Sequence, residues 1–372
     1  MYLVCHNRIV WRLETDFLFR NRVYKGDAMK GKRLRWALLG VGQAGKVHYF
    51  ALREADLNLV GFASQDGNAL SGNFANIHSN LLPAGHGGLQ DISSFVVEED
   101  WLKLVERSDV DVVLCALPTP MHNEVALAAK KHGKHVLVEK PMAGDAKSAF
   151  EMLRAFDRSD LKLGVGQILP HFSAFGWLVD KMKDPGELGQ LMELTMWRQI
   201  PIVDEECTAK ALKACGGWAY DLCVHDAHLV AMGCGFPTAV NSEGQFMHEQ
   251  PLHLTTSYRF GGNDAPKVTT ICGATDGVEG FMHEFDAKFE SGQTAVFRGN
   301  KLCVGGEDVT GTLPSGDTID VFARQVEAFD AHCRDEGPIG AADPKLAAQT
   351  LRILEAQIQS AESASWKDVT VQ

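Results

Sequence analysis

A glycine-rich loop joins two apolar strand patterns near the start of the chain. Residues 34–39 form the first apolar run, "GVGQAG" at 40–45 follows, and a helical stretch over 44–55 leads to a second apolar run at 57–63. In G-x-G-x-x-G, the first glycine permits a tight turn, the second lets a pyrophosphate approach the backbone, and the third allows close packing of helix on strand. The order of elements predicts a βαβ dinucleotide-binding unit with phosphate at the helix N-terminus. A glycine-rich turn without a ligand is the alternative.

Alternating strand and helix patterns continue beyond this unit. Residues 110–122 contain a continuous apolar run, 123–135 have a helical pattern, and 136–144 form another strand with a polar end. Such alternation predicts a parallel sheet covered by helices on both faces. After about residue 160, strand-like segments separated by Gly and Asn turns predict an open, mainly antiparallel sheet. A last helix is expected over about 345–361, after an Asp-Pro pair.

These patterns predict an α/β protein with two domains and an N-terminal extension. A length of 372 residues exceeds what one ordinary core requires. We expect a poorly ordered extension at 1–28, a Rossmann dinucleotide-binding domain at 29–158, and an α/β domain with a large, mostly antiparallel open sheet at 159–372. The extension has no apolar run long enough for a signal-peptide core or a transmembrane span.

The charge balance favours a small-molecule ligand over nucleic acid or a membrane surface. The chain carries 36 basic and 48 acidic residues, a formal net charge of -12, and lacks the basic surplus that polyanionic partners require. Its nine cysteines include no C-x-x-C pair, which is typical of reduced thiols and argues against a zinc site built from them. We expect a cytoplasmic protein without a metal.

The end of the second strand bears on the choice between NAD and NADP. The dinucleotide fingerprint places an acidic residue there to bind the ribose hydroxyls, whereas this chain has Ser64, Gln65 and Asp66 in turn. Ser64 leaves room for a 2′-phosphate, but no Lys or Arg occurs between Arg53 and Lys103 to neutralise it. We expect NAD as the cofactor, with NADP as the alternative.

The sequence "EKP" at 139–141 stands where a parallel strand ends, which is where open α/β sheets place their ligands. Lys140 there can hydrogen-bond a substrate hydroxyl or the nicotinamide ribose and take part in proton transfer. A surface lysine paired with Glu139 is the alternative, and the motif alone does not separate the two.

The segment "GGWAYDLCVHDAHLVAMG" at 216–233 carries four ionisable residues within an apolar helical pattern. If it is helical, Asp221 and His225 lie at i and i+4 on one face, where the histidine can accept a proton. Asp221 and His228 would lie about 10 Å apart along the axis, too far for one metal ion. We expect Asp226 and His228 at solvated positions on the helix surface.

The motifs together resemble the glucose-fructose oxidoreductase/inositol dehydrogenase (Gfo/Idh/MocA) family from residue 34 to about residue 371. The resemblance rests on "GVGQAG", "TPMH", "EKP" and "GGWAYDLCVHDAH". It implies an NAD(P)-dependent dehydrogenase that oxidises a secondary hydroxyl of a sugar, glycoside or cyclitol, or reduces the corresponding ketone. It also implies a Rossmann domain followed by an open-sheet domain that often pairs with another subunit, so a homodimer or homotetramer is expected.

The resemblance implies roles for particular residues. Lys140, Asp221 and His225 would handle the proton while hydride moves at the nicotinamide. The expected cofactor contacts are Gly40, Gly42, Gln43, Ala44, Gly45, Ser64, Asp66, Pro118, Thr119, His122, Glu139 and Lys140. The expected substrate contacts are Gln167, His171, Phe172, Trp197, Arg198 and Tyr220.

Three residues depart from the family pattern. Trp218 and Cys223 stand in place of glycines, and His228 stands in place of the last aspartate. We expect the first two to reshape the pocket wall and the third to affect a structural hydrogen bond rather than the chemistry.

Two other functions stay open. Some family members retain their cofactor and cleave glycosides by transient oxidation, and no motif here excludes that activity. A redox-silent sensor that binds dinucleotide and sugar is the second alternative. Lys140, Asp221 and His225 argue against a sensor, because binding alone does not need all three.

Overall fold

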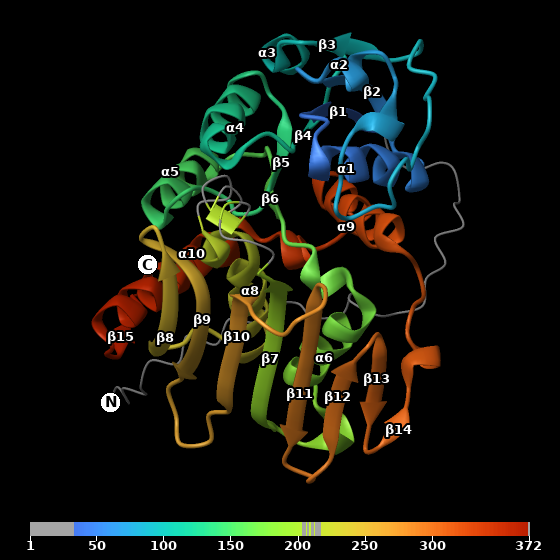
Figure 1. Cartoon of the computed structure of the whole chain (residues 1–372). Helices are drawn as coiled ribbons and strands as arrows, with labels where there is room; N and C mark the ends of the chain where they lie inside the picture. Colours follow the sequence, from blue (N-terminus) through green and yellow to red (C-terminus); the bar gives the residue numbers. More distant parts are fainter. Residues whose placement is uncertain (1–32, 203–205, 207, 210–211, 213–216, 371–372) are drawn as a thin grey trace, which may run out of the picture.

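Two β-sheets with their helices form the body of the protein, one above the other in Figure 1. The computed structural model describes residues 33–202, 206, 208–209, 212 and 217–370. The predicted extension at 1–28 lies outside the described residues.

The first sheet is parallel and has six strands in the order β3-β2-β1-β4-β5-β6. The strands are β1 Arg35–Leu39, β2 Asn58–Ala63, β3 Val96–Glu98, β4 Val112–Cys115, β5 His135–Glu139 and β6 Leu163–Gly166. The helices between them are α1 Gln43–Glu54, α2 Gly67–Leu70, α3 Trp101–Val105, α4 His122–Lys131 and α5 Ala146–Phe156. The apolar runs become its central strands because both faces are covered. This confirms the predicted Rossmann fold, although β6 extends the sheet past the predicted boundary at residue 158.

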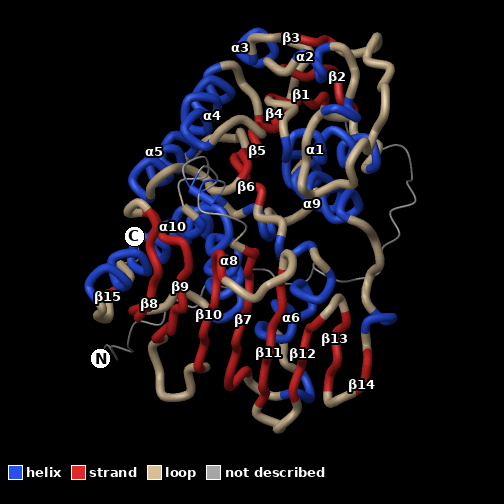
Figure 2. Tube along the Cα trace, viewed as in Figure 1, coloured by secondary structure: helices blue, strands red, loops and turns tan. Residues whose placement is uncertain are grey.

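The second sheet has nine strands in the order β14-β13-β12-β11-β7-β10-β9-β8-β15. The strands are β7 Leu191–Pro201, β8 Ala239–Met247, β9 Gln250–Arg259, β10 Lys267–Thr275, β11 Met282–Phe289, β12 Thr294–Arg298, β13 Lys301–Val304, β14 Glu307–Asp308 and β15 Lys367–Asp368. Only β7 and β10 pair in parallel, so the predicted large, mostly antiparallel sheet is confirmed. Figure 2 shows how this sheet fills the lower half of the molecule.

Three helices cover one face of the second sheet: α6 Ser173–Lys183, α8 Val224–Cys234 and α10 Pro344–Ser363. Their apolar side chains share a core with inward-facing strand residues such as Met196 and Phe285. α10 begins at the predicted Asp-Pro pair, where Asp343 accepts a hydrogen bond from the Lys345 amide. Among the described residues, no helix combines the length and apolarity needed to cross a bilayer.

A further long helix, α9 Thr318–Cys333, returns from the second domain to the first and packs on α1 (Figure 1). Its start is fixed by a capping box in which Asp317 and Asp320 each accept a hydrogen bond from the other's backbone amide. At its far end, the Trp36 indole donates to Asp330 Oδ1 at 2.9 Å in the buried interface. The sequence analysis missed α9, although the two aspartates three residues apart mark its start.

Candidate active site

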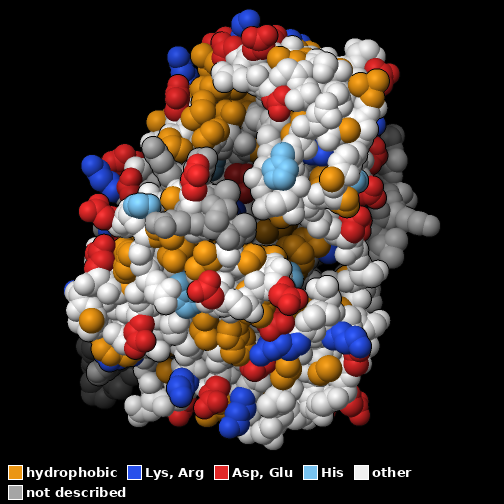
Figure 3. All heavy atoms as spheres, viewed as in Figure 1, with side chains coloured by type: hydrophobic (Ala, Val, Ile, Leu, Met, Phe, Trp, Pro, Cys, Tyr) orange, Lys and Arg blue, Asp and Glu red, His pale blue; other side chains and the backbone are white. Residues whose placement is uncertain are grey.

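A cleft of about 2130 Å³ lies between the two sheets and takes residues from both domains into its walls. The glycine loop after β1, the turn after β4 and the E-K-P sequence after β5 form the upper wall. The lower wall contains residues from β7, α6 and the segment before α8. Figure 3 shows a hollow between the upper and lower parts of the molecule, with hydrophobic side chains gathered below it. The carboxyl ends of the parallel strands therefore open onto the cleft, as the ligand rule for open α/β sheets requires.

The glycine loop has the shape of a phosphate cradle. Gly40 has a φ of 88°, and a Cβ there would lie 2.7 Å from the Ala116 carbonyl oxygen. A Cβ on Gly45 would lie 1.9 Å from the Gly40 oxygen, so α1 and the loop touch backbone to backbone. A Cβ on Gly42 would meet nothing within 4 Å, and no side chain caps α1. The first amides of α1 thus face open space at the positive end of the helix, which fits a pyrophosphate.

The residues after β2 form a turn that uses part of the Asp66 carboxylate. Ser64 Oγ accepts from the Asp66 amide at 3.1 Å, and Asp66 Oδ1 accepts from the Asn68 amide at 2.8 Å to cap α2. Oδ2 makes no hydrogen bond to any described residue, and Ser64, Gln65 and Asp66 all line the cleft. Asp66 therefore has one carboxylate oxygen that is not used in the turn, two residues later than the fingerprint places its acidic residue.

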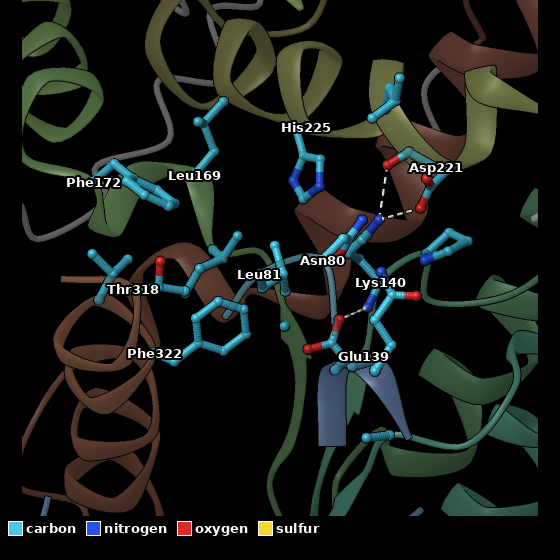
Figure 4. A pocket seen from close by; sticks show the side chains of 18 of the residues that line it. Asn80, Leu81, Glu139, Lys140, Leu169, Phe172, Asp221, His225, Thr318 and Phe322 are labelled. Atoms are coloured by element: carbon cyan, nitrogen blue, oxygen red, sulfur yellow. Dashed lines mark hydrogen bonds and ion pairs between the residues drawn. The ribbon is translucent and has the colours of Figure 1, made fainter. Parts of the chain in front are cut away.

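Lys140 reaches across the cleft to the second domain. Its Nζ donates to Asp221 Oδ1 at 2.7 Å and to the Asp221 carbonyl oxygen at 2.8 Å (Figure 4). The Glu139 carboxylate instead accepts from the Lys140 amide at 2.9 Å. The alternative pairing of the lysine with Glu139 is therefore wrong, and the ammonium group is aimed by a carboxylate of the other wall.

Asp221 lies on a π-helical turn, Ala219–Cys223, that runs directly into α8. The segment is helical as expected, but its first turn is wider than an α-helix. Such turns re-aim side chains and are frequent at functional sites. Here the turn leaves the Asp221 carbonyl and carboxylate close enough together to bind the same ammonium group.

His225 faces the cleft opposite Lys140 (Figure 4). Only 8% of the residue is exposed, and Nδ1 has no hydrogen-bond partner among the described residues. Burial, and then the positive charges of Lys140 and Arg198, lower the pKa of His225 well below its ordinary value of 6.5. The imidazole is thus neutral at pH 7. No hydrogen bond joins it to Asp221 in the described structure, since that carboxylate binds Lys140.

The expected solvent exposure of Asp226 and His228 is wrong, because α8 is enclosed on all sides. Asp226 is 1% exposed and His228 is fully buried. Arg198 Nε donates to Asp226 Oδ1 at 3.0 Å, which ties the helix to β7. Burial raises the pKa of Asp226, and Arg198 opposes that rise. Burial also lowers the pKa of His228 to about 3.

Comparison with known proteins identifies the upper wall. Residues 34–167 match the model of the oxidoreductase family with an NAD-binding Rossmann fold, known as Gfo/Idh/MocA. The N-terminal domain is thus similar to this family over those residues. The match contains the glycine loop, the turn after β4 and the E-K-P sequence.

Two of the relatives similar to this chain are inositol dehydrogenases. Inositol 2-dehydrogenase of Rhizobium meliloti (strain 1021) is 27% identical over 198 residues, 52% of this chain and 52% of the relative. Inositol 2-dehydrogenase 4 of Saccharopolyspora erythraea is 33% identical over 129 residues, 34% of each chain. The matched part therefore spans about half or less of these relatives' length.

The fold likeness extends further than the sequence likeness. A levoglucosan dehydrogenase, solved in complex with NADH and levoglucosan, has a TM-score of 0.74 at 18% identity and covers 92% of this chain and 100% of its own. An oxidoreductase from Thermotoga maritima has a TM-score of 0.73 at 17% identity and covers 91% of this chain and 99% of its own. The second domain of this protein thus has the same fold as theirs.

Most of the predicted site residues line the cleft. They are Gly40, Gly42, Gln43, Ala44, Ser64, Asp66, Pro118, Thr119, His122, Glu139, Lys140, Phe172, Arg198, Tyr220, Asp221 and His225. His122 also joins two parts of the wall, with Nε2 2.9 Å from the Leu117 oxygen and Nδ1 3.1 Å from the Pro141 oxygen. The roles of these residues stay predictions.

Four predicted residues do not line the cleft. Gly45 lies behind the loop, against the Gly40 oxygen. Trp197 alternates with Arg198 along β7 and so points to the other face of the sheet, where its ring lies 4.4 Å below the Arg298 guanidinium. Gln167 is 1% exposed, and His171 has a pKa lowered to about 4, chiefly by burial. The last three thus lie outside the cleft lining, and their expected substrate contacts stay untested predictions.

The sequence analysis missed residues that enter the cleft from distant segments. Asn80 and Leu81 come from the long loop after α2, and Thr318 and Phe322 come from α9 (Figure 4). Phe281 and His283 come from the start of β11. None belongs to a short motif, so only the tertiary structure brings them together. Among the described residues, no cluster of three His, Cys, Asp or Glu side chains is placed to hold a metal.

Proposed function

We propose that the protein is an NAD-dependent oxidoreductase that oxidises a secondary hydroxyl of a sugar, glycoside or cyclitol, or reduces the corresponding ketone. The observation that carries the proposal is the juxtaposition in one cleft of a phosphate cradle, a lysine held by an aspartate, and a neutral histidine. Oxidation of an alcohol requires a base for the hydroxyl proton and a hydride acceptor beside the carbon.

The nicotinamide, when bound, supplies the hydride acceptor. The amides at the start of α1 would hold its pyrophosphate. Asp66 Oδ2 would bind a ribose hydroxyl. NADP is the less favoured cofactor, because among the described residues no Lys or Arg is paired with or adjacent to Ser64.

The three central side chains divide the work on the substrate. His225 is neutral at pH 7, so its imidazole accepts the proton of the hydroxyl. Lys140 binds the same oxygen through its ammonium group and stabilises the negative charge that develops there. Asp221 fixes the ammonium group in place through two contacts on one residue.

Named relatives support a polyhydroxylated substrate without choosing one. They include inositol 2-dehydrogenases and a 1,5-anhydro-D-fructose reductase. The cleft offers both hydrogen-bonding groups, Arg198 among them, and aromatic side chains such as Phe172 and Phe281. That mixture suits the polar edges and apolar faces of a sugar ring.

A two-step screen tests the proposal. NAD, NADP, inositols and pyranosides are first ranked by thermal shift, since a ligand at 100 times its Kd stabilises by about 2.7 kcal/mol. The stabilising pairs are then assayed for NADH formation at 340 nm. Stoichiometric NADH from a polyol supports the proposal. Release of free sugar from a glycoside without net NADH indicates a cofactor-retaining glycosidase instead, and stabilisation without any turnover indicates a sensor.

We further propose that the protein works as a cytoplasmic homodimer or homotetramer. Half-exposed side chains such as Thr195, Trp197 and Ile271 on the face of the sheet opposite α8 support a second copy there. The six described cysteines are free thiols, which supports a reducing compartment. Light scattering at several protein concentrations measures the oligomeric state.

A further inference from the structure

A buried His–Glu pair connects the cofactor helix to the strand that carries Lys140. His48 lies on α1, three residues beyond the last glycine of the loop, and Glu139 is the last residue of β5. His48 Nε2 is 2.5 Å from Glu139 Oε1, and the two side chains are 1% and 11% exposed. Glu139 was among the expected site residues, but His48 was not, because it follows the glycine motif without being part of it.

Both oxygens of the Glu139 carboxylate are engaged. Oε1 contacts His48, and Oε2 accepts from the backbone amide of Lys140 at 2.9 Å. Burial opposes ionisation of this carboxyl, but the hydrogen bond and charge of His48 and the charge of Lys140 outweigh it and lower the pKa of Glu139. An ionised carboxylate only accepts, so His48 Nε2 carries the proton of their bond.

The His48 ring is fixed from a third side. It packs edge-on against Phe322 of α9, with ring centroids 5.0 Å apart and an interplanar angle of 76°. The ring therefore contacts the end of β5 through Glu139 and α9 through Phe322 at once. Because this packing restricts the rotamer of His48, it holds the Nε2 donor in a defined position.

The pair is linked to the other wall of the cleft through the backbone and side chain of Lys140. The link runs from His48 to the Glu139 carboxylate, from there to the Lys140 amide, and from the Lys140 ammonium to Asp221. The charged and titratable groups around that ammonium are Glu139 on β5, Asp221 on the π-helical turn and His225 on α8. The carboxylates of Glu139 and Asp221 thus both lie near the ammonium group, and His48 binds that of Glu139.

We infer that His48 is a positioning residue for Lys140: by holding the Glu139 carboxylate, it fixes the backbone of the lysine and leaves the ammonium group to Asp221 and the substrate. Without His48, Oε1 of the buried Glu139 carboxylate loses its donor. The other cation whose charge acts on this carboxylate is Lys140. Glu139 would then compete with Asp221 for the ammonium group. The inference rests on the proposed function for its kinetic consequence but not for its structural one.

Two variants separate the donor from the bulk of the ring. His48→Leu removes the donor, whereas His48→Gln places an amide N–H near the position of Nε2. We expect His48→Leu to lower kcat about tenfold or more, in the range of coupling within one hydrogen-bond network, and to change the KM for NAD less than about threefold. His48→Gln should restore kcat to within about threefold of the wild type. In a Glu139→Gln background, His48→Leu should have little further effect, because the competing carboxylate is gone.

A second measurement does not depend on turnover. The rate at which an amine-reactive reagent labels Lys140 is followed by mass spectrometry as a function of pH. In His48→Leu the labelling midpoint should rise by about one pH unit, because the freed carboxylate stabilises the ammonium form. In His48→Gln it should stay at the wild-type value.

The outcomes distinguish the two proposals. If the wild type oxidises no polyol, the proposed function fails, and the labelling experiment still tests His48. If the labelling midpoint of His48→Leu is unchanged or lower, the positioning role is overturned, whatever the wild type catalyses. Should His48→Leu not fold, His48→Asn takes its place, because its shorter amide does not reach the position of Nε2, and an unchanged labelling midpoint in that variant would overturn the role as well.

Discussion

The two walls of the cleft are built on different principles. The upper wall binds through backbone, in six consecutive residues from Gly40 to Gly45, and its geometry follows from where a Cβ fits and where it does not. The lower wall acts through side chains such as Arg198, Asp221 and His225, each held by burial or by an ion pair. A site formed by backbone groups requires a short local sequence motif, whereas a site formed by side chains depends on residues from distant segments. This difference explains why the family model matches only residues 34–167 while the fold likeness covers nearly the whole chain.

The largest effect expected from the comparison is at Lys140, where the two walls meet. Lys140→Met should lower kcat by a factor of about 10² to 10³, the usual effect of losing one preorganised donor that stabilises charge at the reacting oxygen. Cofactor binding should persist, because backbone amides hold the pyrophosphate. Calorimetry with NAD checks this. Loss of NAD binding in the variant would show that the Lys140 side chain binds the cofactor, and it would contradict the idea that the upper wall binds through backbone alone.

His225 tests whether the lower wall supplies the base. His225→Asn should lower kcat at least 100-fold, about 2.7 kcal/mol of barrier, with little change in melting temperature. Because the pKa of His225 is lowered, the neutral base is present at pH 7 and is lost only as pH falls below 6.5. The acidic limb of the kcat profile for oxidation should therefore lie below pH 6.5 and disappear in the variant. A folded variant that retains both kcat and the acidic limb would assign proton removal to Lys140.

Arg198 tests how much of the lower wall depends on a buried ion pair. Arg198→Met leaves the Asp226 carboxylate buried without its partner and should destabilise the fold by about 3–5 kcal/mol at pH 7. Since burial already raises the pKa of Asp226, the loss should be greatest at high pH and should shrink as pH falls and the carboxyl is protonated. Denaturant unfolding at pH 5 and pH 8 measures both. Equal losses at the two pH values would contradict a charge-based explanation.

The glycines sharpen the comparison on the upper wall. A Cβ on Gly42 meets nothing within 4 Å, so Gly42→Ala should fold normally yet weaken NAD binding at least tenfold, about 1.4 kcal/mol, by filling the phosphate cradle. Gly45→Ala is the matched control, since its Cβ would lie 1.9 Å from the Gly40 oxygen and should impair folding itself. Thermal unfolding and calorimetry separate the two. Unchanged NAD affinity in Gly42→Ala would mean that phosphate binds elsewhere.

The smallest expected effect is at the ribose end. The wild type should prefer NAD modestly, and Ser64→Asp should sharpen that preference by adding a ribose ligand and repelling a 2′-phosphate. The ratio of kcat/KM for NAD and NADP is the measurement. A wild-type preference for NADP of tenfold or more would show that a cation from elsewhere in the chain reaches Ser64.

The sequence predicted the upper wall well because its determinants are local. The loop, α1 and the E-K-P strand end follow from glycine spacing and apolar runs within about 100 residues, as βαβ units generally do. The lower wall was predicted only where the "GGWAYDLCVHDAH" segment pointed to it. Asp226 and His228 were misplaced because α8 is buried by α6, α10 and the second sheet, which are distant in the sequence. Trp197 was misplaced because strand alternation does not say which face meets a ligand. Asn80 and Phe322 reach the cleft, and His48 reaches Glu139 beside it, through tertiary folding that no local pattern records.

Because α9 returns from the second domain to the first, the two domains cannot be separated by a single cut in the chain. The apolar cluster around Trp36 and Leu38 includes Val326 and Phe329 of α9. Residues 34–167 cut out as an independent unit would therefore expose a strip of their own interior and lose the hydrogen bond from Trp36 to Asp330. A chimera that exchanges cofactor halves between relatives has to carry α9 along with the first sheet. The motifs of the nucleotide-binding domain thus lie in one continuous segment. The domain that folds as a unit consists of two segments, because it includes α9.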